Sequence, residues 1–357
     1  DNRLYLDFTY YKTDSRNQIL KLATTAASGY TSQVRNAGHI RNRGYEIQLG
    51  AVPIQTSKGF RWNLDLNYGA NSSKVVKLDD EGLITSYQLY SSGIQILASV
   101  GEAYGTLFGT SYVRDANGNV VVDANGLPKI STTNKTLGKF TPDWTGGISN
   151  TFSYRSLSLS FLIDASVGGS IFSNTNKTGK YTGVLANTLS GRDAEHGGLW
   201  YYTDAMGNNV RLSESPSYSV SSDGLYYAQV NGQSTRVYQD GIMVEGVTES
   251  GSKNEEVVSA EKYYHRIYSI AEANVYDASY VKLREVALSY RLPRLWTQKL
   301  HLQEASVTLT GRNLWTIYKS VPNIDPESAL TTGNAQGVEA YSLPTTSSFG
   351  VNLSVKF

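Results

Sequence analysis

Residues 60–69, FRWNLDLNYG, decide the fold class. Every second side chain in this stretch is apolar, from Phe60 through Leu64 to Tyr68, and the residues between them are Arg, Asn, Asp, Asn and Gly. A period of two residues is typical of a β-strand with one apolar and one polar face. This segment is therefore predicted to be an extended strand between two different environments.

The same alternation recurs along the chain. It is regular in residues 3–13, 157–167 and 347–357, and less regular in residues 45–52, 144–152, 281–290 and 307–318. The fold class predicted is therefore all-β, with eight long strands. Between Leu283 and Val286 the apolar positions change parity, which predicts a β-bulge near Arg284 and Glu285.

Connections between these strands alternate in length. Residues 53–59 and 154–156 are short links and residues 292–304 are a moderate one, whereas the long links are residues 15–38, 70–142, 168–276 and 319–341. Short turns at one end and long loops at the other are typical of outer-membrane β-barrels.

Strand length separates a membrane barrel from its main alternative, a soluble β-sandwich. Sandwich strands usually have about five or six residues, whereas several segments here extend for roughly eleven. Phe60 and Tyr68 share a face, about 26 Å apart along the strand and about 20 Å along the normal of a tilted barrel. That spacing fits aromatic girdles at both rims, and it favours an antiparallel transmembrane β-barrel whose outward faces contact outer-membrane lipid.

Composition excludes several other classes. The chain has 32 Lys+Arg, 31 Asp+Glu and a formal net charge of +1, so no basic surface for nucleic acid is expected. It has no Cys, and its longest uninterrupted apolar run is four residues, too short for a transmembrane helix. HExxH, GxSxG, P-loop and GxGxxG motifs are absent, and no catalytic residue, metal or cofactor is predicted.

One acidic run imitates a calcium loop. In RDANGNVVVDANGLPKIST, the spacing of Asp115, Asn117 and Asn119 matches the start of an EF-hand, but Val120 replaces the required Gly and Gly126 the required Glu. The two Asn-Gly pairs are therefore predicted to form hairpin turns, without calcium.

Several motifs, in order, are similar to the C-terminal part of the SusC/RagA family of TonB-dependent outer-membrane transporters. They cover nearly the whole chain: NRGYEIQL (42–49), LGKFTPDWTGGISNTFSY (137–154), GVTESGSKNEEVVSAEKYY (246–264), DASYVKLREVALSYRLP (277–293), GRNLW (311–315), DPE (325–327) and a last strand ending in Phe357.

This resemblance implies a larger protein. Such transporters have an N-terminal plug, a TonB-contacting segment and about 22 barrel strands, so residues 1–357 would be the C-terminal part of the barrel, with the plug and the TonB-contacting segment absent from this chain. A self-contained eight-stranded barrel is the alternative, but its many short inward side chains would leave the lumen underfilled.

The implied function is TonB-dependent import of a large nutrient, a glycan or an oligopeptide, through the outer membrane of a Gram-negative, Bacteroidota-like cell. A SusD-like surface lipoprotein would act as the lid, and the TonB complex would act through the missing N-terminal part. Two alternatives stay open: a passive outer-membrane barrel or surface anchor with binding loops, and a secreted carbohydrate-binding β protein.

Aromatic clusters in the long loops are the candidate ligand contacts, because flat amphipathic rings stack on sugars and grip peptides. Packing inside the loops and docking of a partner protein are the alternative roles. By the resemblance, Phe357 is also the assembly signal, besides being an aromatic at the periplasmic rim. The candidate ligand-contacting residues are Trp200, Tyr201, Tyr202, Tyr226, Tyr227, Tyr263, Tyr264 and Tyr268.

Overall fold

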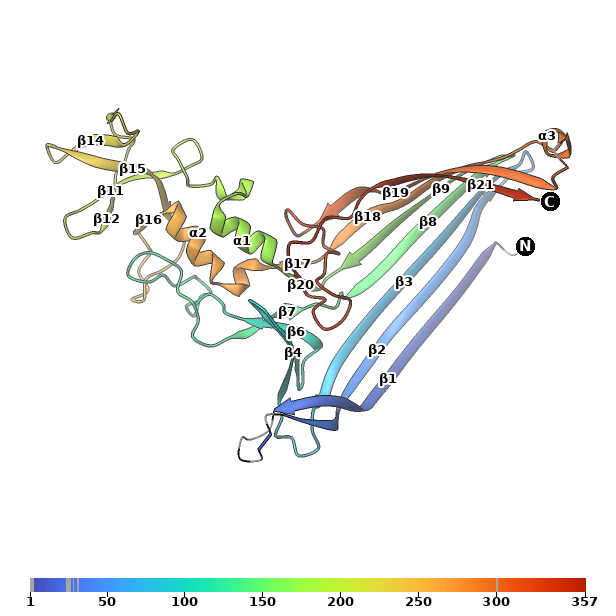
Figure 1. The fold of residues 1–357 in the computed structure, drawn as a ribbon, viewed down its shortest axis with the longest axis horizontal. Helices are drawn as coiled ribbons and strands as arrows, with labels where there is room; N and C mark the ends of the chain where they lie inside the picture. Colours follow the sequence, from blue (N-terminus) through green and yellow to red (C-terminus); the bar gives the residue numbers. More distant parts are fainter. Residues whose placement is uncertain (1–2, 24–26, 28, 31, 300) are drawn as a thin grey trace.

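The computed structural model describes residues 3–23, 27, 29, 30, 32–299 and 301–357. Its largest element is an eight-stranded antiparallel sheet, here called the wall, with the strand order β1-β2-β3-β8-β9-β18-β19-β21 (Figure 1). Among the described residues, no helix is long and apolar enough to cross a membrane. The wall strands are β1 (Leu4–Ala23), β2 (Ser32–Gln55), β3 (Phe60–Lys77), β8 (Trp144–Tyr154), β9 (Leu157–Val167), β18 (Tyr280–Arg291), β19 (Glu304–Lys319) and β21 (Ser348–Lys356).

The eight predicted strands are confirmed, and so is the bulge. Pairing of β18 with both of its neighbours shifts register between Leu283 and Glu285. The predicted bounds of two loops are wrong, because β1 and β2 stay paired through residues 15–23 and 32–38, and β3 continues to Lys77. Side chains beyond Tyr11 are mostly polar on both faces, so the apolar alternation ends there, but backbone pairing does not depend on it.

One end of the wall holds the start of β1, the C-terminus, the turns at residues 56–59 and 155–156, and helix α3 (Arg294–Lys299) (Figure 1). The long connections all lie at the opposite end. The predicted asymmetry between short and long connections is confirmed.

Three long connections fold together into one body, here called the head, formed by residues 78–143, 168–279 and 320–347. The first connection forms β4 (Ser86–Ser91), β5 (Gln95–Ser99), β6 (Tyr104–Gly109) and β7 (Lys135–Lys139). The third contributes β20 (Val338–Glu339), which pairs with β10 and so joins the second connection. The second forms β10 (Ser170–Ser173), α1 (Asn174–Thr182), β11 (Leu199–Thr203), β12 (Asn209–Arg211), β13 (Tyr218–Val220), β14 (Tyr226–Val230), β15 (Gln233–Met243), β16 (Val257–Ser259), α2 (Ala260–Tyr268) and β17 (Val275–Asp277).

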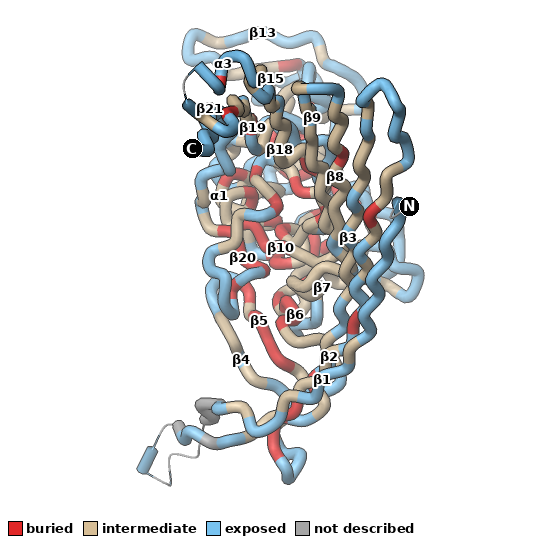
Figure 2. Tube along the Cα trace, turned by 90° about the vertical axis from the view of Figure 1, so that its right-hand side faces the viewer, coloured by how far each residue is buried: buried red, intermediate tan, exposed pale blue. Residues whose placement is uncertain are grey.

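The largest buried core lies in the head and not in the wall (Figure 2). Residues from all three connections form it: Ile94, Ile96, Leu107, Phe172, Ala271 and Val338. On the wall, large apolar side chains such as Leu6 and Leu353 are 66% and 63% exposed. The wall therefore presents an apolar surface that none of the described residues covers with a second layer.

Register across the wall sorts its side chains into two faces. One row of direct cross-strand neighbours on the outward face is Leu6, Leu49, Leu66, Ile148, Ile163, Leu283 and Trp315. The adjacent row on the opposite, inward face is Asp7, Gln48, Asn67, Gly147, Asp164, Lys282 and Thr316. Apolar side chains follow one another outward across the sheet, and polar side chains follow one another inward.

Aromatic pairs lie near both limits of the outward apolar band. Tyr68 packs on Trp144 with ring centroids 5.7 Å apart, and Phe60 stacks on Phe152 at 6.5 Å. Aromatic belts of this kind mark the levels of lipid headgroups in membrane barrels.

Candidate functional site

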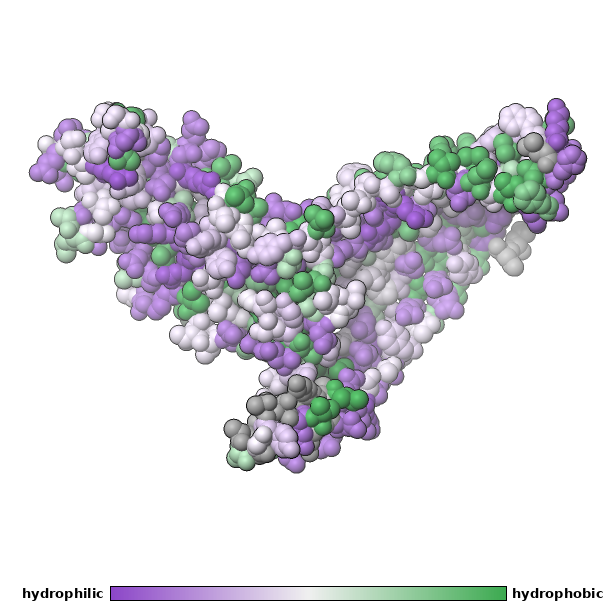
Figure 3. All heavy atoms as spheres, viewed as in Figure 1, coloured by the Kyte–Doolittle hydropathy of each residue, from purple (hydrophilic) through white to green (hydrophobic). Residues whose placement is uncertain are grey.

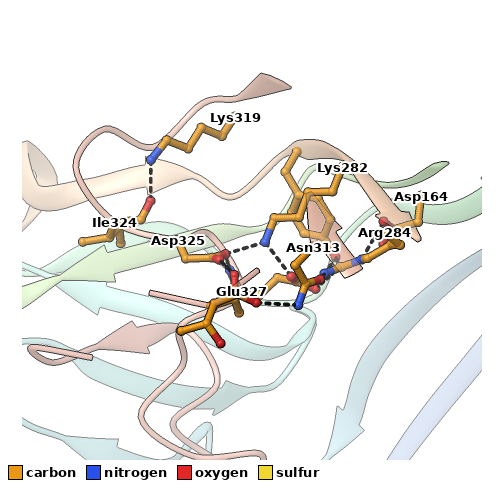
Figure 4. Close-up of polar contacts among 11 residues, drawn as sticks. Asp164, Lys282, Arg284, Asn313, Lys319, Ile324, Asp325 and Glu327 are labelled. Atoms are coloured by element: carbon orange, nitrogen blue, oxygen red, sulfur yellow. Dashed lines mark hydrogen bonds and ion pairs between the residues drawn. The ribbon is translucent and has the colours of Figure 1, made fainter. Parts of the chain in front are cut away.

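An ion cluster joins the wall to the third connection of the head (Figure 4). Its members are Asp164 of β9, Lys282 and Arg284 of β18, and Asp325 and Glu327 of the DPE motif. Lys282 Nζ donates to Asp325 Oδ1 and to Glu327 Oε2, both at 2.6 Å. Arg284 Nε donates to Asp164 Oδ1 at 2.6 Å, and its Nη2 pairs with Glu327.

The bulge in β18 makes this arrangement possible. Arg284 is the extra residue, so Lys282 and Arg284 both reach carboxylates on the inward side while Leu283 and Val286 keep their outward rows. A bulge commonly redirects one side chain in this way.

The ion cluster is largely buried, and its carboxylates are charged. The Lys282 side chain is only 4% exposed and that of Asp325 only 8%. Burial alone raises the pKa of Asp325, but hydrogen bonds from Lys282 and Thr345 outweigh it and lower that pKa. Burial also acts to raise the pKa of Glu327, and hydrogen bonds from Arg284, Lys282 and Tyr280 lower it. Both carboxylates are therefore charged at neutral pH.

A second contact joins the third connection to the start of α1. Glu339 is fully buried and accepts hydrogen bonds from the hydroxyls of Ser173 at 2.7 Å and Thr175 at 2.6 Å. The backbone N–H groups of Thr175 and Ser342 donate to the same carboxylate. Ser173 is also the N-cap of α1, so the carboxylate lies where the helix leaves its first N–H groups free.

Two further arginines, Arg114 and Arg266, join the first connection to the second. Arg266 of α2 donates to Asp123 and to the carbonyl of Pro128, both at 2.9 Å. Arg114 pairs with Glu272 at 3.0 Å. All three connections are thus linked by charged contacts, and the head is one assembly at one end of the wall.

The structure divides the eight candidate loop aromatics. Trp200 is 7% exposed and packs with Ala228 and Val237 in the core of a small sheet formed by β11 to β15. Tyr202 and Tyr226 pack against that core. Tyr227 follows Tyr226 on β14, opposite Ser219 of β13 and Arg236 of β15. Trp200, Tyr202 and Tyr226 therefore contribute to packing within the head.

Two of the other candidates, Tyr263 and Tyr264, line hollows beside α2. One hollow, of about 620 Å³, is lined by both Tyr263 and Tyr264 together with Tyr112, Ile242 and Met243. The second, of about 400 Å³, lies between α1, α2 and β15 and is lined by Tyr181, Asp240, Glu261, Tyr264 and His265.

Two of the candidate tyrosines, Tyr264 and Tyr201, form hydrogen bonds through their hydroxyl groups. The hydroxyl of Tyr264 donates to the carbonyls of Asn187 and Ser190 at 3.1 Å, so its ring is held between the two hollows. Tyr201 stacks on Tyr238 and donates to Asp240, and burial raises the pKa of that carboxyl.

Tyr268 packs on Tyr181 at 4.9 Å and lies in neither hollow. The structure thus brings Tyr263 and Tyr264 together at the larger hollow. Tyr264 also lines the second hollow, which Tyr201 adjoins through its hydrogen bond to Asp240. It does not gather all eight residues at one site.

The calcium-like run forms two turns, as predicted. Gly118 and Gly126 have φ values of 87° and 76°, and each turn begins with an Asp whose carboxylate accepts backbone N–H groups of its own turn. Across the described ranges, no group of three or more His, Asp or Glu side chains is placed to hold a metal ion.

Sequence reasoning noted the VKLRE and DPE motifs but not their pairing, and it missed Asp164 and Glu339. The signal in the sequence was the placement of Lys282 and Arg284 within an otherwise alternating strand, since buried cations need carboxylate partners. The identity of those partners depends on contacts between segments distant in the sequence.

The fold, its two faces and its loop-covered end define the class: the chain is part of an antiparallel transmembrane β-barrel. No protein-family model matches it. It is 26% identical to TonB-dependent receptor P3 of Formosa agariphila and 24% identical to TonB-dependent receptor P26 of that organism, in each case over 100% of this chain and 33% of the relative. The resemblance to the SusC/RagA family of TonB-dependent transporters is confirmed.

Solved structures show the same fold. The RagAB peptide transporter superposes with a TM-score of 0.60 and 19% identity, over 100% of this chain and 34% of that chain. The RagAB peptide importer in its "open-open" state gives 0.60 and 17%, over 100% and 33%. The chain therefore spans about a third of the length of the proteins it matches.

Proposed function

We propose that residues 1–357 are the C-terminal part of the barrel of a TonB-dependent importer in the outer membrane of a Gram-negative, Bacteroidota-like bacterium. The plug and the TonB-contacting segment would lie outside this chain. The observation that carries the proposal is the sorting of the wall into an apolar outward face and a polar inward face. Such a wall fits lipid on one side and a hydrated or plugged lumen on the other.

The cargo would be a glycan or an oligopeptide too large for a porin. The head lies at the loop end of the wall, where cargo arriving from outside meets the protein first. A SusD-like surface lipoprotein would close over the head, a proposal that rests on the family resemblance. No covalent step is part of this function.

Ligand contact is assigned to the aromatics that line the hollows, chiefly Tyr263 and Tyr264, with Tyr201 behind them. Tyr263 is the best probe, because the structure gives it a place in the larger hollow and a T-shaped contact with Tyr264 at 5.1 Å. Replacing Tyr263 with Phe should lower affinity for the cargo about five-fold, the effect of one lost hydrogen bond. Tyr218→Phe is the matched control, since Tyr218 packs on Trp200 in the small sheet and lines neither hollow.

Uptake by cells tests the proposal as a whole. A strain that lacks the full-length gene is complemented with it and grown with glycans or with oligopeptides as the only nutrient. Energised import predicts that growth on one class of nutrient requires both this gene and TonB. Uptake that continues without TonB would instead indicate a passive barrel, and a full-length protein that is soluble without detergent would contradict membrane insertion.

A further inference from the structure

The outward face of β1, β2 and β3 changes character beyond its aromatic rim. At the rim, Tyr10 lies directly opposite Tyr45, with ring centroids 5.3 Å apart. The next outward row toward the head is Lys12, Arg43 and Ser72, and the row after that is Asp14, Arg41 and Lys74. Cations thus replace the apolar side chains as soon as the aromatic band ends.

Few of these cations are neutralised. Asp14 is the only acidic side chain in the two rows, and its Oδ1 is engaged by His39 at 2.6 Å and by Arg41 at 2.8 Å. The side chains of Lys12, Arg43 and Lys74 are exposed and, within the described part of the chain, form neither an ion pair nor a hydrogen bond. These three residues are here called the basic patch.

The inward face at the same height is different. The residues there are neutral: Tyr11, Thr13 and Ser15 on β1, Ile40, Asn42 and Gly44 on β2, and Asn71, Ser73 and Val75 on β3. Val75 is fully buried under the first connection of the head, packed with Leu78 and Ala98. The positive charge is therefore confined to the side of the strands that the head leaves uncovered.

Distance places the basic patch at headgroup level. Lys12 and Arg43 lie two residues beyond the Tyr10 and Tyr45 rings, about 7 Å along an antiparallel strand. Aromatic belts lie at the membrane interface, and Lys and Arg next to such an interface attract anionic lipid. A guanidinium forms two parallel bonds to a phosphate, and an ammonium adds a point charge.

We propose that the basic patch binds the phosphate groups of an anionic glycolipid in the outer leaflet of the membrane. This inference rests on the proposed function only for which end of the wall faces outward. It adds a binding site on the lipid side of the protein, separate from the lumen and from the hollows of the head.

Lipid binding by the purified full-length protein tests the inference. The protein is reconstituted in phosphatidylcholine vesicles that contain lipid A, or lipid A from which the phosphates have been removed, and the lipid A retained per protein is measured over a range of salt concentrations. The wild type should retain the phosphorylated form preferentially, and salt should weaken that retention. The triple variant Lys12→Gln/Arg43→Gln/Lys74→Gln should lose on the order of a hundred-fold in affinity, about five-fold per charge.

Three exposed cations at the opposite end of the wall provide the control: Lys58→Gln/Arg294→Gln/Lys299→Gln should leave retention unchanged. Thermal unfolding of both triple variants verifies that each is folded. Equal retention of both lipid forms by the wild type, an unaffected patch variant, or an equal loss in the control would overturn the inference. So would the loss of a copurifying acidic protein with lipid retention unchanged. TonB-dependent uptake is measured separately, so failure of the import proposal is distinguishable from failure of this one.

Discussion

Lys282 shows how one side chain can hold a loop against a barrel wall. Its ammonium group lies between the carboxylates of Asp325 and Glu327 and over the ring of Tyr280, at 5.0 Å from the ring centroid. Desolvating a cation is costly, and here two anions offset that cost. Removing the cation would leave the buried carboxylate of Asp325 without its ion-pair partner, while Glu327 would keep its pair with Arg284.

Replacing Lys282 with Met should therefore destabilise the packing of the third connection by roughly 3 kcal/mol, the cost of breaking a buried ion pair. Hydrogen exchange and limited proteolysis of residues 320–347 would measure it. The control is Arg291→Met on the same strand, because Arg291 pairs with Glu304 at 2.8 Å but is 69% exposed. An exposed pair of that kind contributes less than about 1 kcal/mol, and equal effects of the two variants would contradict the assignment.

Acid should release the same connection. The pKa values of Asp325 and Glu327 lie below their ordinary values of 3.8 and 4.5, so the folded state holds fewer protons than the unfolded state in that range. Their contribution to stability is thus complete above the ordinary values and is lost as the pH falls through the lowered ones. Hydrogen exchange in residues 320–330 should accelerate below about pH 4, and the double variant Asp325→Asn/Glu327→Gln should abolish this acid-dependent step.

At the scale of elements, tyrosines and glycines pair across the first two strands. Tyr5 lies opposite Gly50 and Tyr11 opposite Gly44, and a Cβ at either glycine would collide with the tyrosine ring. Each ring crosses β2 and its hydroxyl reaches β3, at Asp65 and Asn71. Cross-strand pairs of this kind fix the register of long strands.

Because neighbouring residues of a wall strand lie on opposite faces, we expect an Arg substitution to destabilise the barrel at an outward residue and to be tolerated at the adjacent inward residue. Phe161 lies in an outward row with Leu64 and Val286, midway between the two aromatic levels, whereas Ser160 lies inward between Thr151 and Ala287. Phe161→Arg should cost about 2 to 4 kcal/mol near the membrane midplane, and Ser160→Arg should be tolerated. Heat-dependent gel mobility of the full-length protein from membranes would compare their assembly. Equal tolerance of both substitutions would contradict the outward assignment.

Much of the wall could be predicted from the sequence, because lipid and water impose different side chains on successive residues. The paired ends of β1 and β2 could not, since polar side chains occur on both of their faces. Four of the five members of the ion cluster lie in the VKLRE and DPE motifs, but Arg284 and Asp164 are 120 residues apart and Lys282 and Asp325 are 43 apart. No local pattern specifies such pairs. The loop aromatics were chosen only because aromatic residues are clustered in the long loops. Such clustering does not distinguish Trp200, which is packed in a core, from Tyr263, which lines a hollow.

The whole molecule combines a thin wall with a densely packed head. Phe357 follows β21 at the terminus end of the wall and is 84% exposed, with the outward parity of Leu353 and Val355. The space-filling view shows apolar side chains gathered toward that end of the wall (Figure 3). An uncovered aromatic ring at this position fits both a rim residue and the proposed assembly signal.

Deleting Phe357 should lower the surface abundance of the full-length protein, and Phe357→Trp should preserve it because an aromatic ring is retained. Quantitative surface labelling of cells that express the wild type and both variants measures the difference. Normal abundance of the deletion variant would remove the signal role and leave only the rim role.

The outward face of the wall contacts fluid hydrocarbon, and this affects which substitutions the sequence can accept during evolution. Acyl chains rearrange around any apolar shape, so exchanges among Leu, Val, Ile and Phe on the outward rows leave no permanent void. Within the head, the same exchanges alter a closed volume and cost about 1 kcal/mol for each methylene group removed. The outward face of the wall can therefore accept exchanges among apolar residues one at a time. In the core of the head, an exchange at one residue requires compensating changes at its neighbours.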